Sequence, residues 1–150
     1  MSGLKDIAVT VIGASADQPG SDPSGNATAI LHEIADLLER LASDGSQGMI
    51  DLRAMPLTSG DRAQLEEVLA AGAVRVAIDA AGPTEVVETV YPGVWWTRHH
   101  NESGETVAEF IEVTVCPEIL KSHIEDVREG WAQLRRVLAL DASDADESDH

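Results

Sequence analysis

The sequence predicts an α+β fold: a mixed β-sheet, built from a βαβ unit and an antiparallel meander, with helices packed mainly on one face. The meander is predicted by residues 84–115, which form the run richest in β-formers. Two turn signals divide this run, namely Pro92-Gly93 and the segment Asn101-Glu102-Ser103-Gly104. We therefore expect strands at residues 84–90, 94–99 and 105–115.

The βαβ unit is predicted from the segment before the meander. Residues 49–53 (MIDLR) and 74–78 (VRVAI) have the composition of strands, and residues 61–71 have helical spacing. At the start of that helix, Asp61 and Gln64 form a capping-box pattern. Two strands joined through a helix are usually parallel neighbours, so this unit makes the expected sheet mixed.

Two further helices are predicted from apolar periodicity. The first covers residues 26–42, with Asn26 or Thr28 as its cap. The second begins near Cys116-Pro117-Glu118, because proline is favoured at the first helical position. We expect its stripe to pack across the sheet, with a helix-to-helix homodimer as the alternative. The stripe comprises Leu120, Ile124, Val127, Trp131, Leu134 and Leu138.

The predicted organisation is a single domain with polar ends. Residues 1–25 comprise a strand at 7–12 and a flexible linker rich in Pro, Gly and Asp. Residues 26–140 form one α+β domain. Residues 141–150 (DASDADESDH) are expected to be a disordered acidic tail.

Charge and cysteine content exclude several functional classes. The formal net charge is −17, which opposes binding to nucleic acids and to anionic membranes. The single cysteine cannot form an internal disulfide or hold an iron–sulfur cluster alone, so no cofactor is predicted. The apolar run near the N-terminus is too short for a signal sequence or a membrane span, which favours a cytoplasmic location.

Trp95 and Trp96 are candidates for a binding surface. Adjacent residues of a strand point to opposite faces of the sheet, so the two indoles lie on different faces. One interpretation has one tryptophan in the core and the other half-covered by a loop or terminus. The alternative is an exposed aromatic patch near Glu88, Phe110 and Glu112, which would suit protein binding.

Evidence for other chemistry is weaker. His99, His100, Cys116 and His123 are the plausible soft metal ligands, and they define the alternative of a metal- or redox-handling protein. Their spacing favours an exposed histidine pair and a small buried thiol instead. The meander also carries several carboxylates, but the sequence shows no catalytic triad order, nucleophile elbow or phosphate loop, so no enzyme is predicted. These carboxylates are Glu85, Glu88, Glu109 and Glu112.

Three segments carry a resemblance to a known family. They read IDLRAMPL, GPTEVVETVYPGVWWTRHHN and EFIEVTVCPEIL, and with them residues 29–138 resemble the C-terminal conserved region of the HupH/HyaF family of hydrogenase expression proteins. The resemblance implies a chaperone or assembly role in maturation of nickel–iron hydrogenase. It implies as partners the precursor of the iron–sulfur small subunit and other maturation proteins. Together with the two-face argument, it suggests a partner surface of Glu88, Pro92, Gly93, Trp95 and Trp96.

Overall fold

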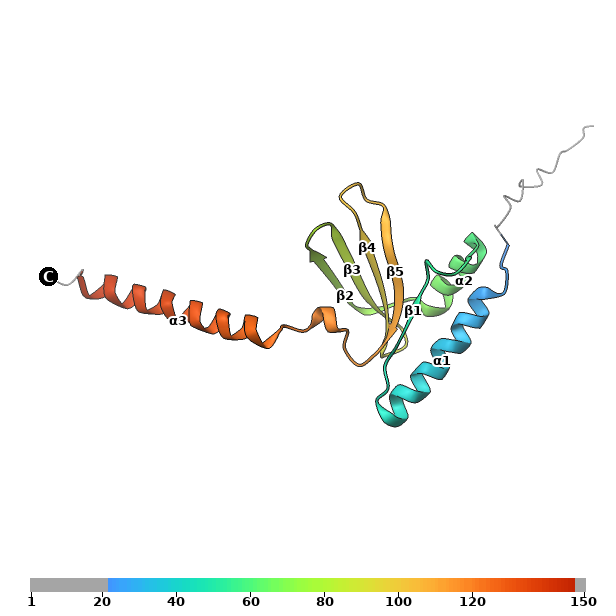
Figure 1. Cartoon of the computed structure of the whole chain (residues 1–150), viewed down its shortest axis with the longest axis horizontal. Coiled ribbons are helices and arrows are strands. Elements are labelled where there is room, and N and C mark those ends of the chain that lie inside the picture. Colours follow the sequence, from blue (N-terminus) through green and yellow to red (C-terminus); the bar gives the residue numbers. More distant parts are fainter. Residues whose placement is uncertain (1–21, 148–150) are drawn as a thin grey trace, which may run out of the picture. The chain divides into compact units, whose positions relative to one another are not determined.

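The computed structural model describes residues 22–147, and the predicted strand at 7–12 lies outside them. The chain divides into two compact units, Met1–Val115 and Cys116–His150, and the single domain expected for residues 26–140 stays a prediction. In its described residues, 22–115, the first unit, called the sheet unit below, has two helices and five strands, arranged as in Figure 1. In chain order these are α1 (Asn26–Asp44), β1 (Gly48–Asp51), α2 (Ser59–Leu69), β2 (Ala71–Asp79), β3 (Pro83–Thr89), β4 (Val94–His100) and β5 (Thr106–Val113).

The strands form one sheet in the order β1-β5-β4-β3-β2, and every neighbouring pair is antiparallel. The α+β fold and the meander β3-β4-β5 are therefore confirmed. The expected parallel βαβ pair is wrong, because β1 and β2 lie at opposite edges of the sheet. β1 pairs with β5 instead, which sets Ile50 opposite Ile111 and buries both side chains in the core.

The core lies between one face of the sheet and the two helices (Figure 1). This arrangement follows from the apolar stripes of α1 and α2, whose inward positions are spaced by three or four residues. The sheet contributes the side chains that alternate toward this face. The buried members of the core include Ile30 and Ile34 of α1, Leu65 and Leu69 of α2, and Trp96 and Ile111 of the sheet.

Asp61 joins the starts of the two helices. The capping box at α2 is formed by Thr58 and Asp61, not by the predicted pair Asp61 and Gln64, so α2 begins two residues earlier than expected. The buried Asp61 carboxylate also accepts hydrogen bonds from the Ser24 hydroxyl at 2.6 Å and the Ser24 backbone N–H at 2.9 Å. These bonds, with those from Thr58, hold the pKa of Asp61 well below its usual value. Gly25, not Asn26 or Thr28, occupies the cap position of α1.

The second unit contains a 3₁₀ turn, η1 (Glu118–Leu120), followed by α3 (Ile124–Glu147). The helix continues past Asp141, so the first part of the predicted disordered tail is helical. The apolar side chains of the predicted stripe within α3 are exposed, and Trp131 has an exposed fraction of 68%. Packing of this stripe on the sheet, like the helix-to-helix dimer, stays a prediction.

Candidate partner-binding site

The two adjacent tryptophans of β4 lie on opposite faces of the sheet, as predicted. Trp95 is opposite Glu88 and Glu112, whereas Trp96 is opposite Val87 and Ile111. Neither indole is exposed, however, since their exposed fractions are 6% and 7%. Of the two interpretations, the alternative of an exposed aromatic patch is therefore wrong.

Each indole has its polar end satisfied within the sheet unit. Trp95 Nε1 donates to the carbonyl oxygen of Thr114 at 3.0 Å, and Trp96 Nε1 donates to Glu109 Oε1 at 2.9 Å. Tryptophan is well suited to such sites, because its large apolar surface can be buried once its N–H finds an acceptor. The other predicted surface residues are Glu88 and Gly93, which are half-buried, and Pro92, which is exposed. Their role in binding stays a prediction.

The face of the sheet that carries Trp95 contains an unpartnered hydroxyl. Thr97 is 1% exposed, and its Oγ1 has no hydrogen-bond partner among the described residues. A buried polar group without a partner costs about 1–3 kcal/mol, whereas an apolar group of the same shape avoids this cost. On the same face, Thr84 Oγ1 lies 2.6 Å from His99 Nδ1 and is therefore satisfied.

We expect Thr97→Val to raise the free energy of unfolding by about 1 kcal/mol, because the isosteric valine removes the unpaired hydroxyl. The matched control is Thr84→Val, which should lower it, since His99 would lose its hydroxyl partner. Urea unfolding monitored by circular dichroism gives both values. A loss of stability in Thr97→Val comparable to that of the control would show that the Thr97 hydroxyl is satisfied.

A buried carboxylate lies on the other face, beneath Trp96. Glu109 is 3% exposed and accepts from Arg62 Nη1 at 2.7 Å and Arg98 Nε at 2.9 Å, in addition to the Trp96 indole. Burial alone would raise the pKa of Glu109, but hydrogen bonds from Arg62, Arg98 and Trp96 outweigh it and lower the pKa. The network therefore connects α2, β4 and β5 through one ionised side chain.

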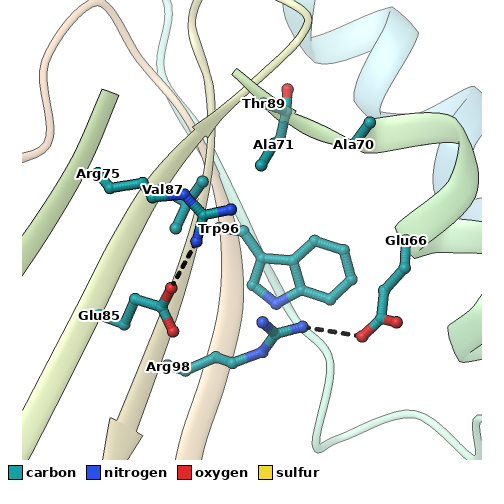
Figure 2. A pocket seen from close by; sticks show the side chains of 9 residues that line it. All are labelled: Glu66, Ala70, Ala71, Arg75, Glu85, Val87, Thr89, Trp96 and Arg98. Carbon is teal, nitrogen blue, oxygen red and sulfur yellow. Dashed lines mark hydrogen bonds and ion pairs between the residues drawn. The ribbon is translucent and has the colours of Figure 1, made fainter. Parts of the chain in front are cut away.

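A small pocket of about 150 Å³ opens beside this network, between α2 and strands β2 to β4 (Figure 2). The Arg98 guanidinium lies 4.5 Å from the centre of the Trp96 ring, and its Nη2 contacts Glu66 at 3.2 Å. Figure 2 also shows Arg75, whose Nη1 contacts Glu85 Oε1 at 3.3 Å. Each guanidinium in this pocket is paired with a carboxylate of the same chain, so the charges in the pocket balance. A charged group of a binding protein would have to displace one of these internal ion pairs.

A second hollow, of about 240 Å³, is almost entirely apolar. We call it the α1–α2 groove. Val68 and Tyr91 on its walls are 38% and 43% exposed, so apolar surface is accessible there. Glu39 lies four residues after the groove residue Ala35 on α1, so the two side chains are neighbours on the helix surface. Glu39 is exposed, and it places an acidic group beside the apolar groove. The lining residues are Leu31, Ile34, Ala35, Leu38, Val68, Leu69 and Tyr91.

The predicted turn at Pro92-Gly93 lies close to α1, next to the α1–α2 groove. Gly93 has φ +89°, and a Cβ there would lie 3.2 Å from Leu41 Cδ2 and 3.7 Å from Leu38 Cδ2. Glycine is favoured because it tolerates this backbone conformation and allows the close approach to α1. The turn therefore holds the neighbouring Tyr91 in position at the groove.

The alternative metal ligands are not brought together within the sheet unit. His99 contacts Thr84, whereas His100 Nδ1 lies 3.2 Å from Thr106 Oγ1. Cys116 and His123 belong to the second unit. Among the described residues, no group of three or more His, Cys, Asp or Glu side chains is placed to hold a metal ion. The metal- and redox-handling alternative thus gains no geometric support from them.

Sequence reasoning missed the Glu109 network and the α1–α2 groove. The sequence contains a signal for the network. Glu109 interrupts the apolar alternation of the last strand, and Arg98 lies two residues after Trp96, so the two side chains share one face of their strand. The contribution of Arg62 could not be found this way, since it depends on how α2 lies against the sheet. The groove likewise depends on the contact between two helices.

These features define a small α+β domain with a fully antiparallel sheet, an internal ion network and an apolar groove. The chain belongs to the family described as HupH hydrogenase expression protein, C-terminal conserved region, whose model matches residues 25–140. This confirms the resemblance found in the sequence.

Individual relatives agree with this assignment. The chain is 31% identical over 128 residues to "Hydrogenase expression/formation protein HupH" of Rhodobacter capsulatus, covering 84% of this chain and 46% of that protein. It is 28% identical to "Hydrogenase expression/formation protein HoxQ" of Azotobacter vinelandii, covering 80% and 44%. The chain thus spans less than half the length of these curated relatives.

A solved structure confirms the fold. The hydrogenase expression protein HupH from Thiobacillus denitrificans matches with a TM-score of 0.74 and 42% identity, covering 78% of this chain and 98% of the solved one. In the part of the chain that the structure describes, no helix has the length and apolar character needed to cross a membrane.

Proposed function

We propose that this chain is a non-catalytic accessory protein in maturation of [NiFe] hydrogenase, acting in the cytoplasm without a cofactor of its own. Membership of the HupH family and the names of the relatives, which describe hydrogenase expression and formation, support this role. We propose further that its client is the precursor of the iron–sulfur small subunit.

The observation that carries the binding role is the apolar α1–α2 groove, beside which Glu39 is exposed. Monomeric domains seldom leave connected apolar surface open unless it contacts something, and this groove combines exposed Val68, Tyr91 and the adjoining Val90. The net charge of −17 and the exposed Glu39 favour a client segment with basic groups beside an apolar centre.

The predicted surface residues acquire different roles in this proposal. Pro92 is exposed beside Tyr91 and can contact the client directly, whereas Gly93 fixes the turn against α1. Trp95 and Trp96 are buried, so they support the strand from which the turn leaves. Their substitution by alanine should unfold the sheet unit before it affects binding, since removing a buried aromatic side chain costs about 3–5 kcal/mol.

The test is co-purification of the tagged chain with the small-subunit precursor, with the large subunit as the specificity control. We expect selective recovery of the small subunit, reduced about tenfold by Val68→Asp or Tyr91→Ser, because both changes remove apolar contact in the groove. The matched control is Val107→Ser, which alters a valine that is 54% exposed on β5, outside the groove.

Circular dichroism establishes that each variant is folded before recovery is compared. Undiminished recovery with both groove variants would refute the groove as the binding surface. Equal recovery of both hydrogenase subunits, or of neither, would refute the small subunit as the specific client.

A further inference from the structure

Strand β2 is an edge strand of the sheet. It pairs with β3 on one side, and no strand of the described residues pairs with its other side. With 9 residues it is much longer than β1, the opposite edge, which has 4. Edge strands that stay unpaired are usually short, or protected by charged side chains, proline, a β-bulge or a covering element. β2 contains neither lysine nor proline, and its irregularity lies between Ala71 and Arg75, so residues 75–79 form a regular edge whose side chains are exposed or half-buried.

The regular part of β2 is complementary to itself. Its register with β3 shifts between Ala71 and Arg75, so continuous pairing covers residues 75–79, with the sequence Arg-Val-Ala-Ile-Asp. An antiparallel copy of this stretch centred on Ala77 places Arg75 opposite Asp79 of the second copy. The same register places Val76 opposite Ile78, and Ala77 opposite Ala77.

The faces of the sheet match in this register. Side chains alternate along a strand, so Arg75, Ala77 and Asp79 share one face while Val76 and Ile78 share the other. Each pairing therefore joins residues on the same face, as a two-fold axis perpendicular to the sheet requires. The result is two Arg–Asp pairs on one face and two Val–Ile pairs on the other, both favourable cross-strand combinations.

Arg75 is placed to make the intermolecular pair. Its side chain is 63% exposed, and its Nη1 contacts Glu85 at 3.3 Å. A guanidinium carries five N–H donors, so this contact leaves other donors of Arg75 available for a second carboxylate. Asp79 is exposed at the end of the same strand. A second copy would therefore place Asp79 on Arg75 without breaking the Arg75–Glu85 contact.

We propose that two copies of this chain associate through antiparallel pairing of β2 with β2, centred on Ala77, to form one continuous sheet. The occupant of the edge is a second copy because the charges and apolar side chains of residues 75–79 complement themselves in that register. This surface is distinct from the α1–α2 groove, and its test requires no hydrogenase subunit, so either proposal can fail without the other.

Charge exchange on the full-length chain tests the pairing. Arg75→Asp places Asp opposite Asp, and Asp79→Arg places Arg opposite Arg, so each variant alone should have a dimer dissociation constant raised about tenfold or more by sedimentation. Mixing the two variants restores both opposite-charge pairs. We therefore expect heterodimers in the mixture with a dissociation constant close to that of the native chain.

Cysteine crosslinking tests the register. In a Cys116→Ser background, Ala77→Cys should form a disulfide-linked dimer on mild oxidation, because Ala77 faces its own copy across the axis. Val76→Cys and Ile78→Cys should crosslink poorly alone and efficiently when mixed, since each faces the other. Ala77 is exposed whereas Val76 and Ile78 are half-buried, so the decisive comparison is the mixture of Val76→Cys and Ile78→Cys against each of them alone, which differences in exposure cannot explain.

Several results would overturn the proposal. One is a native chain that stays monomeric across the sedimentation range. Another is a dimer that the charge variants leave unchanged while Trp131→Ser in α3 abolishes it. Crosslinking of Val76→Cys alone as efficient as that of Ala77→Cys would refute the register centred on Ala77.

Discussion

Replacement of Glu109 by glutamine should lower the free energy of unfolding by about 3 kcal/mol, near the lower limit for breaking a buried ion pair. The change keeps the shape of the side chain but removes the charge that Arg62 and Arg98 share. The loss falls near the lower limit because the two arginine side chains are 40% and 29% exposed and keep some contact with water. Urea unfolding followed by far-UV circular dichroism measures it.

The control for this substitution is Glu102→Gln, which makes the same chemical change at an exposed position in the turn between β4 and β5. Surface substitutions of this kind usually change stability by less than about 0.5 kcal/mol. If Glu109→Gln and Glu102→Gln had equal effects, the Glu109 network would contribute nothing to stability.

The same network gives stability a defined pH dependence. The pKa of Glu109 is lower in the folded chain than its unfolded value of about 4.3. Its contribution is therefore complete above about pH 4.3 and is lost as the pH falls through the folded-state pKa. On acidification below that point, the native chain should lose stability more steeply than Glu109→Gln, which has no proton to take up there.

Replacement of Asp61 by alanine is the second large expected effect, because one carboxylate serves the starts of two helices. The substitution leaves Ser24 and Thr58 N–H groups without their acceptor and removes the hydrogen bond from the Ser24 hydroxyl. Thr58→Ala removes only one side of the capping box and should cost about 1 kcal/mol. Asp61→Ala should therefore destabilise the chain more than Thr58→Ala.

Hydrogen exchange provides a local measurement of the same effect. Amides near Ser24 and Ala27 should exchange faster in Asp61→Ala, since both N–H groups face the carboxylate in the native chain. Asp36→Ala is the matched control, because Asp36 is an exposed acid in the middle of α1. Equal stability and equal exchange in the two variants would refute the role of Asp61 as a link between helices.

Much of the fold could be predicted from local patterns in the sequence. The turns at Pro92-Gly93 and Asn101–Gly104 are specified by neighbouring residues. The bounds predicted for the three meander strands agree with the observed bounds to within two residues. The alternation that put Trp95 and Trp96 on opposite faces is likewise a local property of a strand. Their burial is not local, because it depends on which other segments cover each face.

The errors concern contacts between segments distant in the sequence. A strand, a helix and a strand in succession favoured a parallel pair, but β1 pairs with β5, where Ile50 meets Ile111. The predicted capping box starts three residues too late, because Asp61 is the third residue of α2 and Thr58 is its cap. For the candidate site, Pro92 and Gly93 were found from turn chemistry, whereas the groove beside them requires the contact of α1 with α2.

The distribution of tryptophans gives the two units separate optical signals. Trp95 and Trp96 are buried in the sheet unit, whereas the third tryptophan, Trp131, is exposed on α3. An indole in water and an indole in a protein interior fluoresce at different wavelengths and differ in their access to soluble quenchers. Because packing of α3 on the sheet stays a prediction, quenching of the native chain by itself measures whether Trp131 is accessible, and a loss of that quenching on addition of a client would show that α3 becomes covered.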